Sequence, residues 1–246
     1  MHFPGKRRSY SEKLFARRKA LRGIGYIFLT FAIVGAFQNC FLQSWTVGSS
    51  SMSPTLERGE RVVVTPLPFG ISTLFGRLPA LRGPRRGELV LVSVPGAPEP
   101  GFAESLWDAF IRFFTFQSIS PWKRSQSGSP ASLSVKRVIA VPGDTVRMEN
   151  WIFSIRSEGA SAFRSEFEIS GQRYAVRGAE VPSGWKKDLP GSGYLQELKL
   201  GSGEYFVAGD SRGTSADSLL MGPLSAADIR GDVVFRSWPL HRMGTP

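Results

Sequence analysis

The chain has 246 residues, of which 41% are hydrophobic, with 27 glycines and 17 prolines. This composition is typical of a turn-rich folded protein and argues against a disordered one, and the single cysteine excludes an intrachain disulfide. The formal net charge of +11 would suit nucleic-acid binding, but residues 1–22 carry eight Lys/Arg and one acidic residue, which leaves only +4 for the other 224 residues. The basic charge therefore belongs to an N-terminal tail, and no nucleic-acid partner is expected.

An apolar segment follows the basic tail. Residues 23–37 (GIGYIFLTFAIVGAF) contain no charge, and the mostly apolar run extends to the length of about 20 residues that a transmembrane helix requires. Trp45 follows as an interfacial aromatic residue, and the positive-inside rule places the tail in the cytoplasm. A buried helix or a cleaved secretory signal is the alternative. We predict a cytoplasmic tail over 1–22, a transmembrane anchor over 23–44 and an extracytoplasmic domain over 45–246.

Short β-branched or aromatic runs bounded by Gly or Pro follow the apolar segment, and such runs are typical of β-strands. The predicted strands are residues 61–65, 88–94, 135–141, 151–156, 163–169, 205–208 and 232–235. Their spacing predicts a mainly β fold, an antiparallel domain with long insertions. Two insertions, 66–81 and 104–116, are rich in Leu and Phe. They either pack on the core or dip into the outer leaflet of a membrane.

Few residues can carry chemistry. The only histidines are His2, in the tail, and His241, near the C-terminus. A Ser-His-Asp triad or a histidine-ligated metal is therefore not expected, and no metal or cofactor is predicted. Cys40 lies in the predicted anchor and is not a candidate nucleophile. A hydrolase built on this chain would need a lysine or a carboxylate as its base.

Lys136 differs from the other lysines that follow the predicted anchor. Those others are Lys123, Lys186, Lys187 and Lys199. Lys136 lies in a predicted strand, where its side chain shares a face with Val138 and Ala140. Burial there would lower its pKa, and a neutral amine can accept a proton from a serine hydroxyl. The alternative is a strand-edge lysine with its ammonium in water.

Four motifs occur in order along the chain. They are residues 49–56 (SSSMSPTL), 86–90 (RGELV), 136–144 (KRVIAVPGD) and 209–218 (GDSRGTSADS). Behind an N-terminal apolar span, this set resembles the bacterial type I signal peptidases, membrane-anchored serine endopeptidases that remove signal peptides from exported proteins. The resemblance implies a signal-peptidase-like antiparallel β catalytic domain behind one transmembrane helix. From the residues alone, the serine-rich run before Pro54 could equally be an ordinary loop or helix cap.

The resemblance also implies roles for single residues. Ser51 resembles the nucleophile and Lys136 the general base, and the Ser51 amide and Ser49 hydroxyl resemble the oxyanion donors. Ser215 resembles the residue that orients the base. A supporting polar network is implied for Asp210, Arg212 and Asp217, and a pocket that favours Ala-x-Ala-like sites for Val47 and Val135.

Some of these positions leave alternatives open. Asp210 and Arg212 could instead form an ion pair with each other that stabilises a turn. The chain also departs from the pattern common in the family, which has Pro, Gly, Asn and Arg at the positions of Gly48, Ser50, Ser211 and Leu219.

The sequence thus predicts a single-pass protein of the inner (cytoplasmic) membrane that cleaves signal peptides from exported preproteins. Contact with membrane lipid and a functional link to the export machinery are expected. One alternative is a self-cleaving Ser-Lys repressor-type peptidase, which would carry a DNA-binding helix-turn-helix where this chain has a basic tail and an apolar span. The other is a catalytically silent, membrane-anchored binding or assembly protein, against which the intact Ser51, Lys136 and Ser215 argue.

Overall fold

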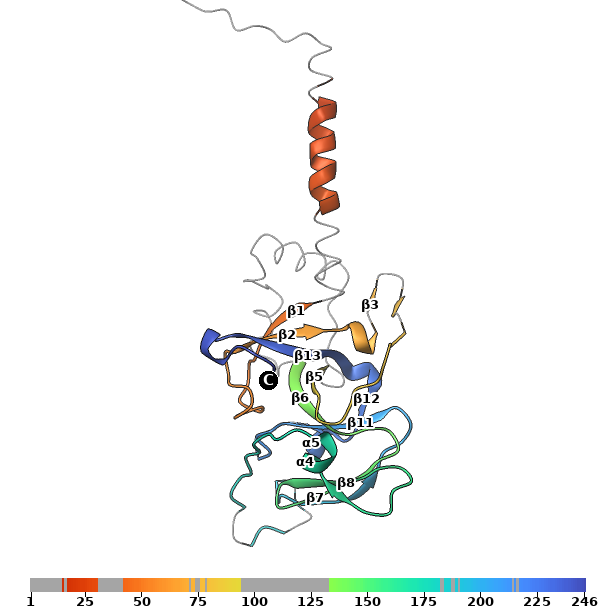
Figure 1. The fold of residues 1–246 in the computed structure, drawn as a ribbon, viewed down its shortest axis with the longest axis vertical. Helices are drawn as coiled ribbons and strands as arrows, with labels where there is room; N and C mark the ends of the chain where they lie inside the picture. The colour runs from red at the N-terminus through yellow and green to blue at the C-terminus, as the bar shows by residue number, and fades with distance from the viewer. Residues whose placement is uncertain are drawn as a thin grey trace, which may run out of the picture.

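The structure is a computed structural model of the chain. It describes residues 15, 17–30, 42–70, 72–73, 76–77, 79–93, 133–181, 184–186, 189, 191–213, 215 and 217–246. The predicted insertion at 104–116 and Cys40 lie outside these residues. A helix over residues 17–30 lies apart from a body built of β-strands (Figure 1).

The described part of the predicted anchor is helical, since the helix over 17–30 continues into it, and residues 31–41 lie outside the described part of the chain. Among the residues that are described, no helix combines the length and the apolar character needed to cross a membrane. Strand β1 (Gln43–Thr46) begins two residues before the predicted domain boundary. Trp45, predicted to anchor at the membrane interface, lies in this strand and packs against a buried cluster.

A seven-stranded sheet forms the centre of the protein, with strand order β1-β2-β13-β5-β6-β11-β12. The strands after β1 are β2 (Arg61–Thr65), β13 (Ile229–Trp238), β5 (Leu89–Ser93), β6 (Leu133–Ala140), β11 (Glu204–Ala208) and β12 (Leu224–Ser225). All neighbouring pairs are antiparallel. The prediction of a mainly β, antiparallel domain is therefore confirmed. The last strand in sequence, β13, lies between β2 and β5 and so joins the N-terminal and central parts of the chain.

The central sheet is buried on both faces. In β5, Leu89 and Leu91 belong to one apolar cluster, whereas Val90 and Val92 belong to another. Successive side chains of a strand point to opposite faces, so the two clusters lie on the two sides of the sheet. A strand covered on both faces reads as a continuous apolar run, and this is why residues 89–92 show no alternation of apolar and polar residues.

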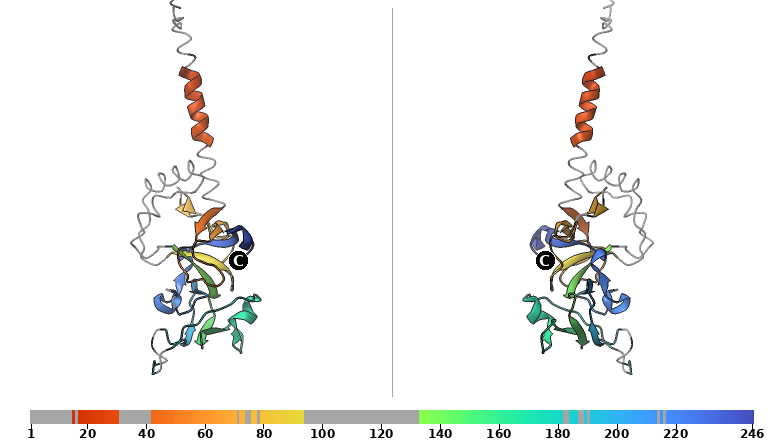
Figure 2. Two further views of the ribbon diagram at one scale, coloured as in Figure 1. Left: turned by 90° about the vertical axis from the view of Figure 1, so that its left-hand side faces the viewer. Right: turned by 90° about the vertical axis from the view of Figure 1, so that its right-hand side faces the viewer.

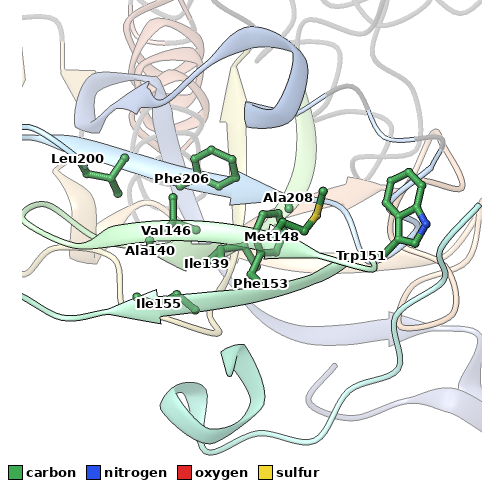
Figure 3. Close-up of a cluster of buried hydrophobic side chains, with 10 residues drawn as sticks. All are labelled: Ile139, Ala140, Val146, Met148, Trp151, Phe153, Ile155, Leu200, Phe206 and Ala208. Atoms are coloured by element: carbon green, nitrogen blue, oxygen red, sulfur yellow. The ribbon is translucent and has the colours of Figure 1, made fainter. Parts of the chain in front are cut away.

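A second sheet lies at the end of the body away from the N-terminal helix (Figure 2). Its order is β10 (Leu195–Lys199), β7 (Thr145–Glu149), β8 (Ile152–Arg156) and β9 (Arg164–Ser165). Side chains from β7 and β8 pack against Ile139, Ala140, Phe206 and Ala208 of the central sheet (Figure 3). The rings of Phe153 and Phe206 meet edge to face at the centre of this cluster, with centroids 5.5 Å apart. The second sheet is thereby fixed against β6 and β11, the two strands that carry the site described below.

The remaining elements are short. They are the β3 (Ser72–Thr73) and β4 (Gly76–Arg77) pair, helices α4 (Glu166–Ser170) and α5 (Ser218–Met221), and the 3-10 turns η1 (Leu67–Phe69), η2 (Ala226–Asp228) and η3 (Leu240–Arg242).

One predicted strand is wrong over most of its length. Residues 163–169 contain only the two-residue β9 and then the helix α4. The helix begins because the Ser165 hydroxyl accepts a hydrogen bond from the Glu168 amide, and it ends at Gly171 in the left-handed conformation. A Ser followed three residues later by Glu is a helix-start pattern, and it prevails here over the β propensity of the aromatic residues. The other six predicted strands are present, the first with the predicted ends, residues 61–65, and the other five with shifted ends.

Candidate active site

Ser51 lies at the start of a tight turn between β1 and β2. The turn is closed by hydrogen bonds from the Ser53 amide to the Ser50 carbonyl (3.0 Å) and from the Leu56 amide to the Met52 carbonyl (2.9 Å). Met52 and Leu56 are fully buried in the apolar cluster on one face of the central sheet, and they anchor the turn there. The Ser51 side chain is 7% exposed, and its Oγ lies 3.0 Å from the Ser49 Oγ. The two serines predicted as nucleophile and oxyanion donor therefore contact each other directly.

Lys136 lies in the middle of β6 and is only 2% exposed. Its register partner in β5 is Val90. Its Nζ donates a hydrogen bond of 2.7 Å to the Ser215 Oγ. Burial lowers the pKa of the Lys136 ammonium, because the charged form loses its hydration, and the negative charge of Asp217 opposes this effect in part. Lys136 is thus a buried amine with a lowered pKa rather than a solvated strand-edge lysine.

The other lysines do not share this environment. Lys186 and Lys199 are exposed, while Lys123 and Lys187 lie outside the described part of the chain. Among the described lysines that follow β1, Lys136 alone is buried.

Gly209 lies where the Ser51 turn meets Ser215, the hydrogen-bond partner of Lys136. A side-chain carbon at this position would collide with the Ser51 carbonyl and with the Ser215 hydroxyl. The backbone of Gly209 therefore lies directly against both residues, and only a hydrogen atom fits between them. Ser211, two residues further along this loop, donates a hydrogen bond from its amide to the Ser51 carbonyl at 3.0 Å. The loop that follows β11 thus holds Ser51 on one side and, through Ser215, Lys136 on the other.

Asp217 holds the same loop from its other end. Its carboxylate accepts hydrogen bonds from the Gly209 amide (2.9 Å) and from the Leu219 amide (3.0 Å), and so it caps helix α5. Leu219, at the position where the resembled family commonly has Arg, packs against the apolar cluster of the second sheet. Asp217 is completely buried, and its charge lies close enough to Lys136 to act on the lysine's pKa.

Asp210 and Arg212 do not pair with each other, contrary to one reading of the sequence. Asp210 is bound by Arg137 through two hydrogen bonds of 2.9 and 2.8 Å, and its second oxygen also accepts the Thr55 hydroxyl. Arg212 pairs with Glu166 of α4 at 2.6 Å. The two charges of the loop are therefore neutralised by partners on two different elements, β6 and α4. Each pair ties the loop to a different part of the protein.

Tyr174 connects these two ion pairs. The guanidinium of Arg137 stacks on the ring of Tyr174, with its central carbon 3.8 Å from the ring centroid. The Tyr174 hydroxyl donates to Glu166 at 2.6 Å. Burial, reinforced by the Glu166 carboxylate, raises the pKa of the Tyr174 phenol, so the phenol stays protonated and can donate. Glu166 also accepts the Phe153 amide at 3.1 Å.

Val47 and Val135, predicted to line a substrate pocket, belong to the same buried cluster as Met52. Val47 immediately follows β1 and Val135 precedes the lysine in β6. Both are 4% exposed. The structure therefore brings the two valines together beside the Ser51 turn.

Sequence reasoning missed several residues of this network. Arg137, Thr55 and Gly209 lie within the motifs but carry no predicted role, and Glu166 and Tyr174 lie outside the motifs. One signal was available for Arg137, because two adjacent charges within an apolar strand must point to opposite faces of the sheet. Glu166 and Tyr174 carry no such local signal, since they meet Arg137 and Arg212 only through the tertiary fold.

Comparison with known proteins gives a consistent family. Residues 20–238 match the family described as "Signal peptidase, peptidase S26". A signal peptidase I of Leptolyngbya laminosa is 22% identical over 224 residues, which cover 91% of this chain and 82% of that protein. A signal peptidase IB of Staphylococcus aureus is 26% identical over 218 residues, which cover 88% and 86% of the two chains.

A crystal structure of a signal peptidase I from Enterococcus faecalis is also similar. It is 18% identical, covers 62% of this chain and 97% of that chain, and has a TM-score of 0.32. The family match includes all four motifs and nearly the whole β domain. The chain therefore belongs to the peptidase S26 family of signal peptidases, and it is a serine endopeptidase that cleaves signal peptides.

Proposed function

We propose that Ser51 is the nucleophile of this peptidase and that Lys136 is its general base. The observation that carries the proposal is the buried Lys136, which donates to Ser215 at 2.7 Å in a loop packed directly on Ser51. An amine with a lowered pKa is neutral in a larger fraction of molecules at neutral pH, and only the neutral amine can take the serine proton. Ser215 is then the residue that orients the lysine.

The reaction follows from these roles. Lys136 removes the Ser51 proton as the oxygen attacks the carbonyl carbon of the scissile peptide bond. The resulting tetrahedral oxyanion is stabilised by the Ser51 amide and the Ser49 hydroxyl, and donors of this kind are worth about 3–4 kcal/mol each. The lysine then gives its proton to the leaving amine, and an acyl ester on Ser51 remains. Water, deprotonated by the same lysine, hydrolyses the ester and frees the enzyme.

Substrate choice follows from the apolar wall beside this turn. Val47 and Val135 lie in the same apolar cluster as Met52, the residue that follows Ser51. We infer that small side chains, as in Ala-x-Ala, precede the cleaved bond, because a shallow apolar site rejects larger groups by overlap. The substrates are then preproteins delivered by the export machinery, as expected for signal peptides.

The membrane arrangement forms part of the same proposal. We infer that the basic tail is cytoplasmic, that the segment following it anchors the chain in the inner membrane, and that the β domain acts at the outer surface. This arrangement rests on the charge of residues 1–22 and on the apolar run after it. Trypsin added to inverted membrane vesicles tests it: the tail should be cut while the β domain is protected. Digestion of the β domain in sealed inverted vesicles would contradict this topology.

The catalytic proposal is tested with Ser51→Ala and, separately, Lys136→Ala in the detergent-solubilised full chain. Both variants should cleave a preprotein roughly 10⁴-fold more slowly than the parent or not at all, because each removes a group that takes part in bond making. Ser161→Ala and Lys199→Ala, which change an exposed serine and an exposed lysine of the second sheet region, are the matched controls. Parental cleavage by Ser51→Ala or by Lys136→Ala would refute the mechanism.

A further inference from the structure

Two arginines from the C-terminal part of the chain hold the far end of the Ser51 turn. Arg236 Nη1 donates to the Thr55 carbonyl at 2.9 Å. Arg242 Nη2 donates to the carbonyls of Pro54 at 3.2 Å and of Thr55 at 3.4 Å. In Figure 1 the dark blue C-terminal segment lies beside the orange segment between β1 and β2. The last strand of the protein thereby reaches back to the backbone just after the nucleophile.

Glu60 fixes both arginines in place. Its carboxylate, 4% exposed, lies 2.8 Å from Arg242 Nη1 and 3.5 Å from Arg236 Nη1. The same carboxylate accepts the Glu57 amide at 3.1 Å, at the end of the turn. Arg236 Nε also donates to the Arg242 carbonyl at 2.5 Å. Glu60, Arg236 and Arg242 form a connected group, which we call the arginine clamp.

The clamp completes the restraint of the turn. Met52 and Leu56 fix it in the apolar cluster, and the Thr55 hydroxyl binds Asp210 of the catalytic loop. The carbonyls of Pro54 and Thr55 can only accept hydrogen bonds, and the clamp supplies the donors. Thr55 is therefore held at its side chain by the loop of Ser215 and at its carbonyl by the clamp.

The contacts favour a positioning role over a large contribution to stability. The Arg242 side chain is 33% exposed, so solvent partly screens its attraction to Glu60, and Arg236 remains beside the buried Glu60 carboxylate when Arg242 is replaced. The Arg242 donors nevertheless act on backbone atoms three and four residues after Ser51. Catalysis is far more sensitive than stability to such placement, since an error of 1 Å in a reacting group can cost about 100-fold in rate.

We propose that the arginine clamp positions Ser51 for attack, and that Arg242 and Arg236 are positioning residues of the peptidase reaction. The inference rests on the proposed role of Ser51 as the nucleophile. It adds a second support to the active site, and none of the three clamp residues, all in the described part of the chain, forms a hydrogen bond or ion pair with Lys136, Ser215 or Asp217. The clamp should therefore affect how often Ser51 occupies its reactive position and leave the protonation of Lys136 unchanged.

The test compares Arg242→Gln and Arg242→Lys with the parent in the detergent-solubilised full chain, using a peptide with small residues before the cleaved bond. Arg242→Gln should lower kcat roughly 10-fold or more and change KM by no more than about twofold. Arg242→Lys keeps the charge and should recover part of the loss. The pH at which kcat begins to fall should stay that of the parent. Arg164→Gln, at an exposed arginine of the second sheet, is the matched control and should behave as the parent.

Three results would overturn the proposal: a kcat of Arg242→Gln within about twofold of the parent, a shift of its kcat–pH profile, or a loss fully accounted for by a smaller folded fraction. If Arg242→Gln does not fold, Arg236→Gln decides, since Arg236 donates to the same Thr55 carbonyl and a parental kcat in that folded variant also overturns the clamp. Ser51→Ala is measured in the same assay. Activity in Ser51→Ala would overturn the proposed nucleophile, whereas an inactive Ser51→Ala together with a parental Arg242→Gln would overturn the clamp alone.

Discussion

Lys136 donates a hydrogen bond of 2.7 Å to the Ser215 hydroxyl, across a separation of 79 residues in the sequence. The lysine comes from the middle of a strand buried on both faces, and the serine comes from the loop after the neighbouring strand β11. The bond satisfies the amine where water has little access, and it fixes the direction in which the amine points. The same loop lies against Ser51, so a single loop contacts both Ser51 and the partner of Lys136, the two ends of the proposed proton transfer.

The pH dependence of cleavage should report the lowered pKa of Lys136. Because only the neutral amine accepts the serine proton, kcat/KM should rise with pH through the lowered pKa and level off below pH 10.5, the ordinary value for lysine. Measuring kcat/KM between pH 5 and about 11 checks this. A profile that is flat over the whole range would contradict a lysine base.

The titration of Lys136 should also make the free energy of unfolding depend on pH, in a direction that the lowered pKa determines. The folded pKa of Lys136 is below the unfolded value, so between the two values the unfolded chain binds more protons than the folded one. The contribution of Lys136 to the free energy of unfolding is therefore least favourable below the folded pKa and improves as pH rises toward 10.5. Denaturant unfolding of the parent and of Lys136→Met at several pH values isolates this contribution. Lys136→Met should lose that part of the pH dependence.

Asp217→Asn should move the activity profile to lower pH. The Asp217 charge partly offsets the effect of burial on Lys136, so removing it lowers the pKa of the lysine further. The amide oxygen of Asn can still accept one of the two backbone N–H groups, and the loss of the other costs about 1 kcal/mol of stability. The acid limb of kcat/KM is the measurement. An unchanged or alkaline-shifted limb in a folded variant would show that Asp217 does not act on the base.

Gly209→Ala should lower kcat by roughly 100-fold, because the added methyl group overlaps the Ser51 carbonyl and the Ser215 hydroxyl and must separate them. KM should change much less, since the residues proposed to line the substrate pocket are not touched. Gly25→Ala is the control, because its added methyl group meets no atom within 4 Å. A Gly209→Ala enzyme with parental kcat would mean that the loop yields without disturbing the site.

The buried Arg137–Asp210 pair should be far more costly to break than an exposed ion pair. Both side chains are at most 2% exposed, so Arg137→Met leaves a buried carboxylate without its counter-charge and should lower the free energy of unfolding by about 3–5 kcal/mol. Arg156→Gln breaks a pair with Glu197 whose side chains are 35% and 49% exposed, and it should cost at most about 1 kcal/mol. Urea denaturation measures both. Equal costs would contradict the assignment of Arg137 to a buried network.

Much of the β architecture could be read from local patterns. Residues 61–65 and 88–94 are β-branched runs bounded by turn residues, and both became strands because these preferences act within a few residues. The strand predicted for residues 163–169 was wrong because the helix cap at Ser165 also acts within a few residues, and aromatic content alone does not distinguish a strand from a helix there. The position of β13 between β2 and β5 carries no local signal. The position of β13 depends on the tertiary fold, in which the apolar faces of all the strands must be buried together.

The sequence by itself determined which residue types could carry the chemistry, because it contains two histidines, one cysteine and, within one of the family motifs, a lysine in an apolar strand. The tertiary structure alone decided the partners of the charged groups. Asp210 binds Arg137 rather than Arg212, Glu166 takes Arg212, and two arginines near the C-terminus hold the Ser51 turn. The physical reason is that a buried charge requires a counter-charge at hydrogen-bonding distance. Which residue meets that requirement depends on how strands distant in the chain are packed together.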